Sequence, residues 1–230
     1  MTSYAATRDR VEHYFDRSAT KVWERLTSDA PVSGIRATVR AGRDRMRALM
    51  LQQLPDDLRG ARILDAGCGT GAMAVELAGR GADVVAVDIS PALVDIARQR
   101  MPANLSGHIN WIAGDMLDAT SGRFDHALAM DSMIYYSAPD IAALLGKAST
   151  RVGGKFVFTL PPRTPALMAM WRLGKLFPRA DRSPTMIPQT TARVADALRV
   201  AGVPGRLKEI ERIKSGFYIS NALVFEGGTR

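Results

Sequence analysis

The feature that most constrains this 230-residue chain is a glycine-rich turn between a short apolar stretch and a helical pattern. Ile63 and Leu64 lead into the turn and predict a buried strand, and a helix is expected from 72 to 80. The turn contains Asp65, Gly67, Cys68, Gly69 and Gly71. Because glycine has no Cβ, three glycines so close together let the backbone turn sharply and approach a ligand. This pattern predicts an open α/β sheet with a ligand site at its strand ends.

The spacing of these glycines separates two classes of ligand. It is Gly-x-Gly-x-Gly, whereas the dinucleotide fingerprint is Gly-x-Gly-x-x-Gly and directs a pyrophosphate to a helix N-terminus. Here the carboxylate of Asp65 stands two residues before Gly67, which suits a cationic ligand. S-adenosylmethionine (SAM) carries an ammonium and a sulfonium but no phosphate. We therefore interpret the turn as part of the SAM site of a class I methyltransferase.

Two more acidic residues follow in the order that such a site requires. Asp88 ends the apolar run 84–87 and is expected to accept hydrogen bonds from both ribose hydroxyls. Asp115 follows the predicted strand 108–113 and is expected to accept from the adenine amino group, with Met116 packing on the ring. The predicted SAM-binding residues are Asp65, Gly67, Cys68, Gly69, Gly71, Asp88, Ile89, Asp115, Met116 and Asp131.

Predicted strands and helices alternate along the chain after residue 60. We expect strands at 61–66, 83–88, 108–113, 124–130, 154–160, 206–213 and 217–225, and helices at 72–80, 90–100, 139–151, 164–177 and 189–201. Alternation predicts a doubly wound, mainly parallel, seven-stranded Rossmann-like sheet, with the last two strands forming an antiparallel hairpin. Residues 1–60 are interpreted as an N-terminal helical arm and 61–230 as the methyltransferase domain, with a helical lid near 163–182.

The formal charge of +8 and the pI near 10.0 call for an anionic partner. The stretch 163–182 contains five cationic residues and one anionic residue. It therefore contributes five minus one, or +4, to the net charge of +8. Its methionines, Trp171 and Phe177 predict a lid over a flat apolar anion or a helix that touches anionic lipid, with a core-covering helix as the alternative. The basic run 35–47 is interpreted as a solvated helix face.

Other features exclude several classes of protein. We expect no secretory signal, and no apolar run approaches the length that crosses a bilayer. The single cysteine, Cys68, excludes an intrachain disulfide and fits a reducing cytoplasm. The three histidines, His13, His108 and His126, are too scattered for a metal site, so none is predicted.

The segment before the glycine turn carries a more specific signal than the turn itself. The stretch 11–26, with Tyr14, Phe15 and Trp23, resembles the N-terminal arm of the magnesium-protoporphyrin IX methyltransferases. The stretches 124–136 and 156–162 resemble the same family, so the resemblance covers essentially the whole chain.

The resemblance implies transfer of the SAM methyl group to the C13 propionate of magnesium protoporphyrin IX, in chlorophyll and bacteriochlorophyll synthesis. It also implies an arm that closes over the cofactor, a partnership with magnesium chelatase, and a cytoplasmic location, peripheral at the photosynthetic (inner) membrane. No nucleic-acid partner is expected. Oxygenic members have a His-Tyr pair where Tyr135 and Tyr136 stand, and a tyrosine at Thr27. Any role that the oxygenic members give to the side chains at these positions therefore does not carry over to this chain. We interpret the chain as a bacterial member from the bacteriochlorophyll branch of the family.

A carboxylate acceptor agrees with the residues available for catalysis. A propionate with a pKa of roughly 4.3 is ionised at neutral pH and needs no general base. Catalysis then depends on alignment of the reacting atoms and exclusion of water. No catalytic residue is assigned beyond the candidates Tyr14, Tyr135 and Tyr136. The substrate-binding candidates are Arg36, Arg40 and Arg163 for the propionates, and Met168 and Trp171 for the macrocycle.

Three alternative functions share the predicted core. A methyltransferase acting on a quinone or phenol would need a base for the hydroxyl, and His126 or His108 would supply it. The net charge suggests RNA methylation, but the Asn/Asp-Pro-Pro-Tyr type of motif is absent, since 131–134 reads Asp-Ser-Met-Ile. A catalytically silent SAM-binding regulator is the third, and the intact glycine turn weighs against it.

Overall fold

The computed structural model describes residues 4–15, 27, 34–116, 122–164 and 185–228. Its seven-stranded sheet has the order β3-β2-β1-β4-β5-β7-β6. The strands are β1 (Arg62–Ala66), β2 (Asp83–Asp88), β3 (His108–Ala113), β4 (His126–Ala129), β5 (Lys155–Leu160), β6 (Gly205–Ser215) and β7 (Tyr218–Gly227). Pairs from β3 to β5 are parallel, and β7 is antiparallel to both its neighbours. The predicted doubly wound, mainly parallel sheet is confirmed.

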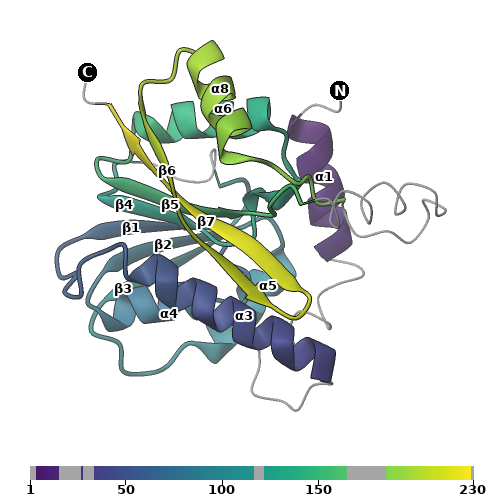
Figure 1. Ribbon diagram of the computed structural model, residues 1–230. Coiled ribbons are helices and arrows are strands. Elements are labelled where there is room, and N and C mark those ends of the chain that lie inside the picture. The colour runs from purple at the N-terminus through teal and green to yellow at the C-terminus, as the bar shows by residue number, and fades with distance from the viewer. Residues whose placement is uncertain (1–3, 16–26, 28–33, 117–121, 165–184, 229–230) are drawn as a thin grey trace.

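Helices cover both faces of this sheet (Figure 1). The helical elements are α1 (Tyr4–Tyr14), α3 (Gly34–Leu51), α4 (Ala72–Gly79), α5 (Pro91–Arg100), η2 (Met133–Tyr135), α6 (Ala138–Ser149) and α8 (Thr191–Val200). Helices α3, α4 and α5 lie on one face, and α6 and α8 lie on the other. Helix α1 lies beyond the carboxyl-terminal ends of the parallel strands. No helix in the described part of the chain combines the length and apolar character needed to span a membrane.

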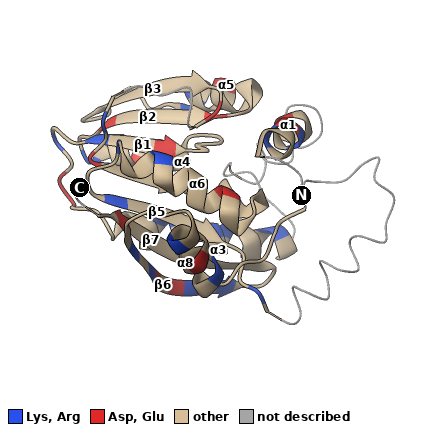
Figure 2. Cartoon of the chain, turned by 90° about the horizontal axis from the view of Figure 1, so that it is seen from above, with Lys and Arg blue, Asp and Glu red and all other residues tan. Residues whose placement is uncertain are grey.

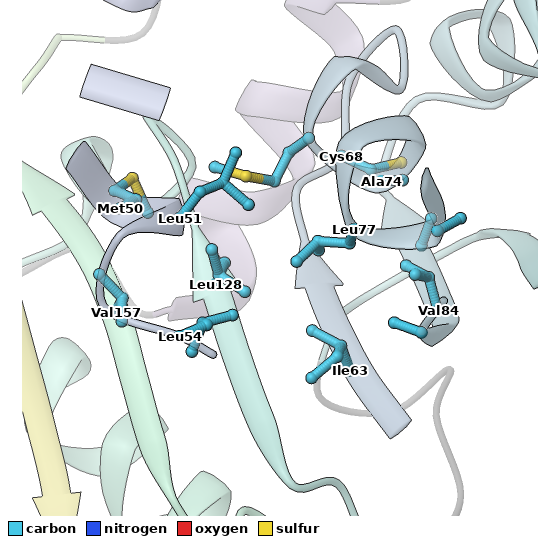
Figure 3. Close-up of a cluster of buried hydrophobic side chains, with 14 of the residues drawn as sticks. Met50, Leu51, Leu54, Ile63, Cys68, Ala74, Leu77, Val84, Leu128 and Val157 are labelled. Carbon is cyan, nitrogen blue, oxygen red and sulfur yellow. The ribbon is translucent and has the colours of Figure 1, made fainter. Parts of the chain in front are cut away.

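The central strands are buried on both faces, which explains their continuous apolar sequence. In β2, Val84 and Ala86 pack in the cluster under α3, α4 and α5, whereas Val85 and Val87 pack in the cluster under α6 and α8. Side chains of a strand alternate between faces, so one apolar run serves both clusters. Figure 3 shows the first cluster, where Met50 of α3 lies near strand residues. Helix α3 thus packs on the sheet, and the domain boundary at residue 60 stays a prediction.

Most predicted boundaries agree with the structure to within a few residues. Ser90 caps α5, accepting a hydrogen bond from the Leu93 N–H at 3.4 Å. The predicted strand 124–130 is shorter, because Phe124 forms only an isolated bridge. Phe217, predicted to begin a strand, instead lies in the turn between β6 and β7 beside Gly216, whose φ is 55°. Thr164, where the predicted helix 164–177 would begin, is not helical, and the rest of that helix and most of the lid near 163–182 fall outside the described residues.

The sheet ends on a charged edge strand. Among the described strands, β6 pairs only with β7, and it carries cations and anions along its length (Figure 2). Charged side chains on an edge strand discourage pairing with another chain. The mixed charge of β6 therefore has a structural explanation that requires no ligand.

Candidate functional site

A cavity of about 310 Å³ lies at the carboxyl-terminal ends of the parallel strands. This volume is at the lower end of the range for small-molecule sites. Of the predicted SAM-binding residues, Asp65, Gly67, Cys68, Gly69, Asp88, Ile89, Asp115, Met116 and Asp131 line it. The structure therefore brings together residues that the sequence separates by up to 66 positions, from Asp65 to Asp131.

The glycine turn adopts backbone angles that other residues avoid. Gly67, Gly69 and Gly71 have φ of 84°, 53° and 88°. A Cβ on Gly67 would lie closer than 3.0 Å to the Cβ of Ser132, so the turn packs against the loop after β4. Gly71 does not line the cavity in the described structure; a Cβ there would lie 2.5 Å from the Trp111 ring. Gly71 therefore makes room for the Trp111 ring, and its contact with SAM stays a prediction.

Asp88 is fixed at the end of β2 by two backbone groups. Its Oδ2 accepts from the Gly69 N–H at 2.8 Å, and its Oδ1 accepts from the Ser90 N–H at 3.0 Å. Each carboxylate oxygen has a second lone pair, so it can also accept from a ribose hydroxyl. The carboxylate thus joins the glycine turn to the start of α5 and faces the cavity.

Asp65 is a buried acid whose second oxygen lacks a partner. Its exposed fraction is 1%, and in the described structure Oδ2 has no hydrogen-bond partner. Burial, and secondarily the charge of Asp88, raise the pKa of Asp65 to about 7. A buried carboxylate oxygen without a partner is costly, and a cationic ligand in the cavity would satisfy it. The residues present therefore fit SAM, whose ammonium and sulfonium supply positive charge.

This raised pKa predicts a pH dependence for the ligand-free protein. The folded pKa of about 7 lies above the unfolded value of about 3.9, so the folded state holds the extra proton between them. The free energy of unfolding from this group therefore falls as pH rises from about 4 to about 7. Urea denaturation of the wild-type protein should show a lower free energy of unfolding at pH 7 than at pH 5. The Asp65→Asn variant should lack this decrease.

The same group couples proton release to ligand binding. A bound cation favours the Asp65 carboxylate, so SAM binding near pH 7 should release a fraction of a proton and tighten from pH 6 to 8. Calorimetry in buffers with different ionisation enthalpies measures this release. Equal proton release by wild type and Asp65→Asn would contradict the assignment to Asp65.

Helix α1 lies over the opposite end of the cavity. The Tyr4 hydroxyl donates to Asp115 Oδ1 at 3.1 Å, and Arg8 Nη1 lies 3.5 Å from Asp115 Oδ2. The Tyr4 ring stacks on Tyr136 with 4.9 Å between centroids. Burial is the largest cause that raises the pKa of Tyr136 to about 12, so its hydroxyl stays protonated at neutral pH. The acid predicted to bind adenine is thus held by α1, a contact that no sequence pattern indicated.

A second polar cluster surrounds Asp131, which has a φ of 57°, the only positive φ of a described non-glycine residue. Its Oδ1 accepts from the Tyr218 hydroxyl and the Thr159 hydroxyl, each at 3.1 Å. Its Oδ2 pairs with the Arg43 guanidinium. The Asp131 N–H donates to Thr159 Oγ1 at 2.8 Å. Groups from α3, β5 and β7 therefore converge on one carboxylate at the cavity wall.

The arginines of α3 correct one interpretation of the sequence. Arg40, Arg43 and Arg47 line the cavity, so the solvated-face interpretation of the run 35–47 is wrong for them. Their spacing of three and four residues places them on one helix face, which was the available signal. Of the other substrate candidates, Arg36 and Arg163 are exposed outside the described wall, and Met168 and Trp171 fall outside the described residues. Tyr135 and Tyr136 line the cavity, whereas Tyr14 is not among its described lining residues.

The histidines lie away from the cavity. His108 and His126 begin β3 and β4, so they lie at the amino-terminal ends of the parallel strands, whereas the cavity lies at the carboxyl-terminal ends. His126 Nδ1 accepts a hydrogen bond from the Lys155 N–H at 3.0 Å. His13 is exposed on α1. None of the three is among the described residues of the wall, and no metal-binding group occurs among the residues described. The two bases suggested for a phenol acceptor are therefore misplaced for that role.

Comparison with protein families gives two matches. The family model described as the C-terminus of magnesium-protoporphyrin IX methyltransferase matches residues 129–226. A general methyltransferase domain model matches residues 63–152. The first match covers Asp131, Thr159 and Tyr218 and most of the C-terminal hairpin but not Arg43, and the second covers the glycine turn.

Individual proteins show the same similarity. The chain is 55% identical over 225 residues to the magnesium-protoporphyrin O-methyltransferase of Rhodobacter capsulatus, covering 97% of this chain and 98% of the relative. It is 30% identical over 161 residues to a ubiquinone biosynthesis O-methyltransferase of Xanthomonas oryzae, covering 67% and 64%. The crystal structure of magnesium protoporphyrin IX methyltransferase from Synechocystis with bound SAH has a TM-score of 0.77 at 21% identity, covering 96% of this chain and all of that chain. This last similarity is one of fold.

Proposed function

This chain belongs to the magnesium-protoporphyrin O-methyltransferases, and from that premise we infer that it transfers the methyl group of SAM to a propionate of magnesium protoporphyrin IX. The product is the monomethyl ester, an intermediate of chlorophyll and bacteriochlorophyll synthesis. The observation that carries this function is the 55% identity to the Rhodobacter capsulatus protein over nearly the full length of both chains. A bacterial relative at this identity also agrees with the predicted bacterial branch.

The chemistry of the cavity supports a carboxylate acceptor. SAM, when bound, supplies an electrophilic methyl group on a sulfonium. A bond forms between a propionate oxygen and the methyl carbon as the carbon–sulfur bond breaks, and its electron pair stays on sulfur in S-adenosylhomocysteine. No proton is released, because the propionate is already ionised. A wall without a described histidine fits this reaction, whereas a phenol requires a base.

We assign the SAM contacts by the order of the strands. Asp65 and the turn with Gly67 and Gly69 accept the cationic end, Asp88 accepts from the ribose hydroxyls, and Asp115 accepts from the adenine amino group. Exclusion of water by the neighbouring side chains lets the reacting atoms stay aligned. These roles are proposals that the SAM-binding experiments in the Discussion test.

The acceptor lies, in this proposal, beyond the methyl group toward Tyr135 and Arg40. Both residues line the cavity, and Tyr135 is buried. Arg40 neutralises a propionate, and Arg36 and Arg163 attract the anionic substrate from outside the cavity. Selection of the C13 propionate over its neighbour is part of the same proposal.

The proposed function is tested by comparing acceptors at saturating SAM. Magnesium protoporphyrin should be methylated, and its monomethyl ester should bind without being methylated further. A catechol that is a precursor of a quinone should not be methylated. Because saturating SAM removes the effect of Asp65 on binding, kcat should stay flat from pH 6.5 to 9. The 30% identity to a ubiquinone biosynthesis enzyme makes a phenol acceptor the second candidate. Methylation of the catechol, with kcat rising through a pKa of about 6–7, would support that candidate.

We also propose that the turn between β6 and β7 contacts an anionic membrane. Phe217 in this turn is 70% exposed and Ile35 in the first turn of α3 is 59% exposed. The two segments touch, since the Ser215 hydroxyl donates to the Thr38 carbonyl at 2.8 Å. In the sequence, Arg36 follows Ile35 and Lys214 lies three residues before Phe217. Exposed apolar side chains beside cations suit the interface of an anionic bilayer.

The double variant Phe217→Ser with Ile35→Ser should weaken binding to vesicles that contain anionic lipid, as measured by co-flotation. Val200→Ser is the matched control, because Val200 is 80% exposed at the end of α8, on the other face of the sheet. Equal binding by both variants would contradict the membrane contact.

Partnership with magnesium chelatase is proposed on family membership alone, and co-purification with chelatase subunits tests it.

A further inference from the structure

The strained residue Asp131 marks a part of the cavity that the assignments above leave without a defined role. A residue other than glycine in the left-handed region is uncommon and carries backbone strain. Such strain persists where the surroundings fix it, and it clusters at ligand sites. Here Arg43, Thr159 and Tyr218 all bind the Asp131 carboxylate. Residues from three other elements thus hold one acid at the wall of the cavity.

The order of the strands places this cluster at one end of the bound donor. Asp115 follows β3 and Asp88 ends β2, so adenine and ribose are assigned to that side of the sheet. The remaining part of SAM, its amino-acid end, must then lie across β1 and β4. The loop after β4 abuts the glycine turn there, because the Ser132 hydroxyl donates to the Ala66 carbonyl at 2.7 Å.

Arg43 is the cation of this cluster that lines the cavity. A guanidinium presents five N–H donors in a fork, so one edge can hold Asp131 while another binds a second carboxylate. The amino-acid end of SAM is a zwitterion with one carboxylate and one ammonium. Arg43 is a cation on the wall, and the buried acid Asp65, also on the wall, becomes a carboxylate when a cation binds, so the two residues match these two charges.

We propose that Arg43 binds the carboxylate of the donor's amino-acid end, and that Asp131, Thr159 and Tyr218 are positioning residues that orient Arg43. The Tyr218 ring also fixes α3, because a Cβ on Gly42 would lie 2.7 Å from it. Helix α3 therefore sits at the distance from β7 that lets Arg43 reach Asp131. The inference rests on SAM being the donor and is independent of the acceptor.

Two ligands that differ only at this end of the molecule test the proposal. S-adenosylhomocysteine carries the amino-acid end, and methylthioadenosine lacks it. By calorimetry, Arg43→Gln should weaken S-adenosylhomocysteine binding at least tenfold and leave methylthioadenosine within twofold of wild type. Retained methylthioadenosine binding also shows that the variant keeps a folded cavity. Arg45→Gln, an exposed neighbour on the same helix, should leave both affinities unchanged.

The positioning role has its own readout. Tyr218→Phe should weaken S-adenosylhomocysteine two- to fivefold without affecting methylthioadenosine, and Arg43→Lys should keep part of the wild-type affinity. Equal loss for both ligands would show that Arg43 is structural and would overturn the proposal. Unchanged binding of S-adenosylhomocysteine with a raised KM for the porphyrin would assign Arg43 to the acceptor instead. Failure to methylate porphyrin would leave these binding results intact, so the two proposals fail separately.

Discussion

Replacing Gly67 with alanine is expected to abolish SAM binding and lower the free energy of unfolding by about 2–5 kcal/mol. The φ of 84° at Gly67 is left-handed, which costs other residues about 1–2 kcal/mol. The added Cβ would also lie closer than 3.0 Å to the Ser132 Cβ, and overpacking costs about 1–3 kcal/mol. Relief of this clash would push the loop after β4 away from the turn. Urea denaturation and calorimetry with S-adenosylhomocysteine measure both effects.

Gly79→Ala is the matched control for this substitution. Gly79 ends α4, has no positive φ, and has nothing within 4 Å of an added Cβ. Alanine is favoured over glycine in helices by up to about 1 kcal/mol, so stability should be unchanged or slightly higher. If Gly67→Ala bound the ligand as well as Gly79→Ala does, the turn would not form the donor site.

Asp88→Asn is expected to weaken SAM binding by about 100-fold, corresponding to about 3 kcal/mol. Both Asp88 oxygens accept backbone N–H groups, from Gly69 and Ser90. An asparagine amide must turn its NH₂ toward one of these donors, so one bond to the backbone is lost. The ribose hydroxyls also lose a charged acceptor, and each such bond contributes about 1.5–3 kcal/mol. Calorimetry with SAM gives the change directly.

Asp83→Asn provides the comparison, because Asp83 is exposed at the other end of the same strand. It should bind SAM as wild type does. Unchanged affinity in Asp88→Asn would remove the ribose assignment, and a similar loss in both variants would indicate a general effect of charge.

The parts of the site that the sequence predicted are those with a local pattern. The run 84–87 is apolar at every position, because β2 is buried on both faces, and Asp88 interrupts the run where the strand reaches the cavity. Gly67 could be identified because a tight turn after a strand requires glycine whatever the rest of the chain does. In each case the physical constraint acts between residues a few positions apart.

The parts of the site that could not be predicted depend on contacts between segments that lie far apart in the sequence. Tyr4 binds Asp115 across 111 positions, and Arg43 pairs with Asp131 across 88. A basic helical run has the same sequence whether it faces water or a cavity, so the role of Arg43 needed the structure. Gly71 shows the same limit: its role follows from the Trp111 ring, which no local pattern places beside it.

The fate of the transferred methyl group tests the central claim most directly. Isotopically labelled SAM is incubated with the protein and magnesium protoporphyrin, and the labelled product is treated with mild alkali. A methyl ester of a propionate hydrolyses and releases the label as volatile methanol, which is the predicted result. Label that stays on the product through alkali treatment, as in a methyl ether, or no label transferred to the porphyrin, would contradict methylation of a carboxylate.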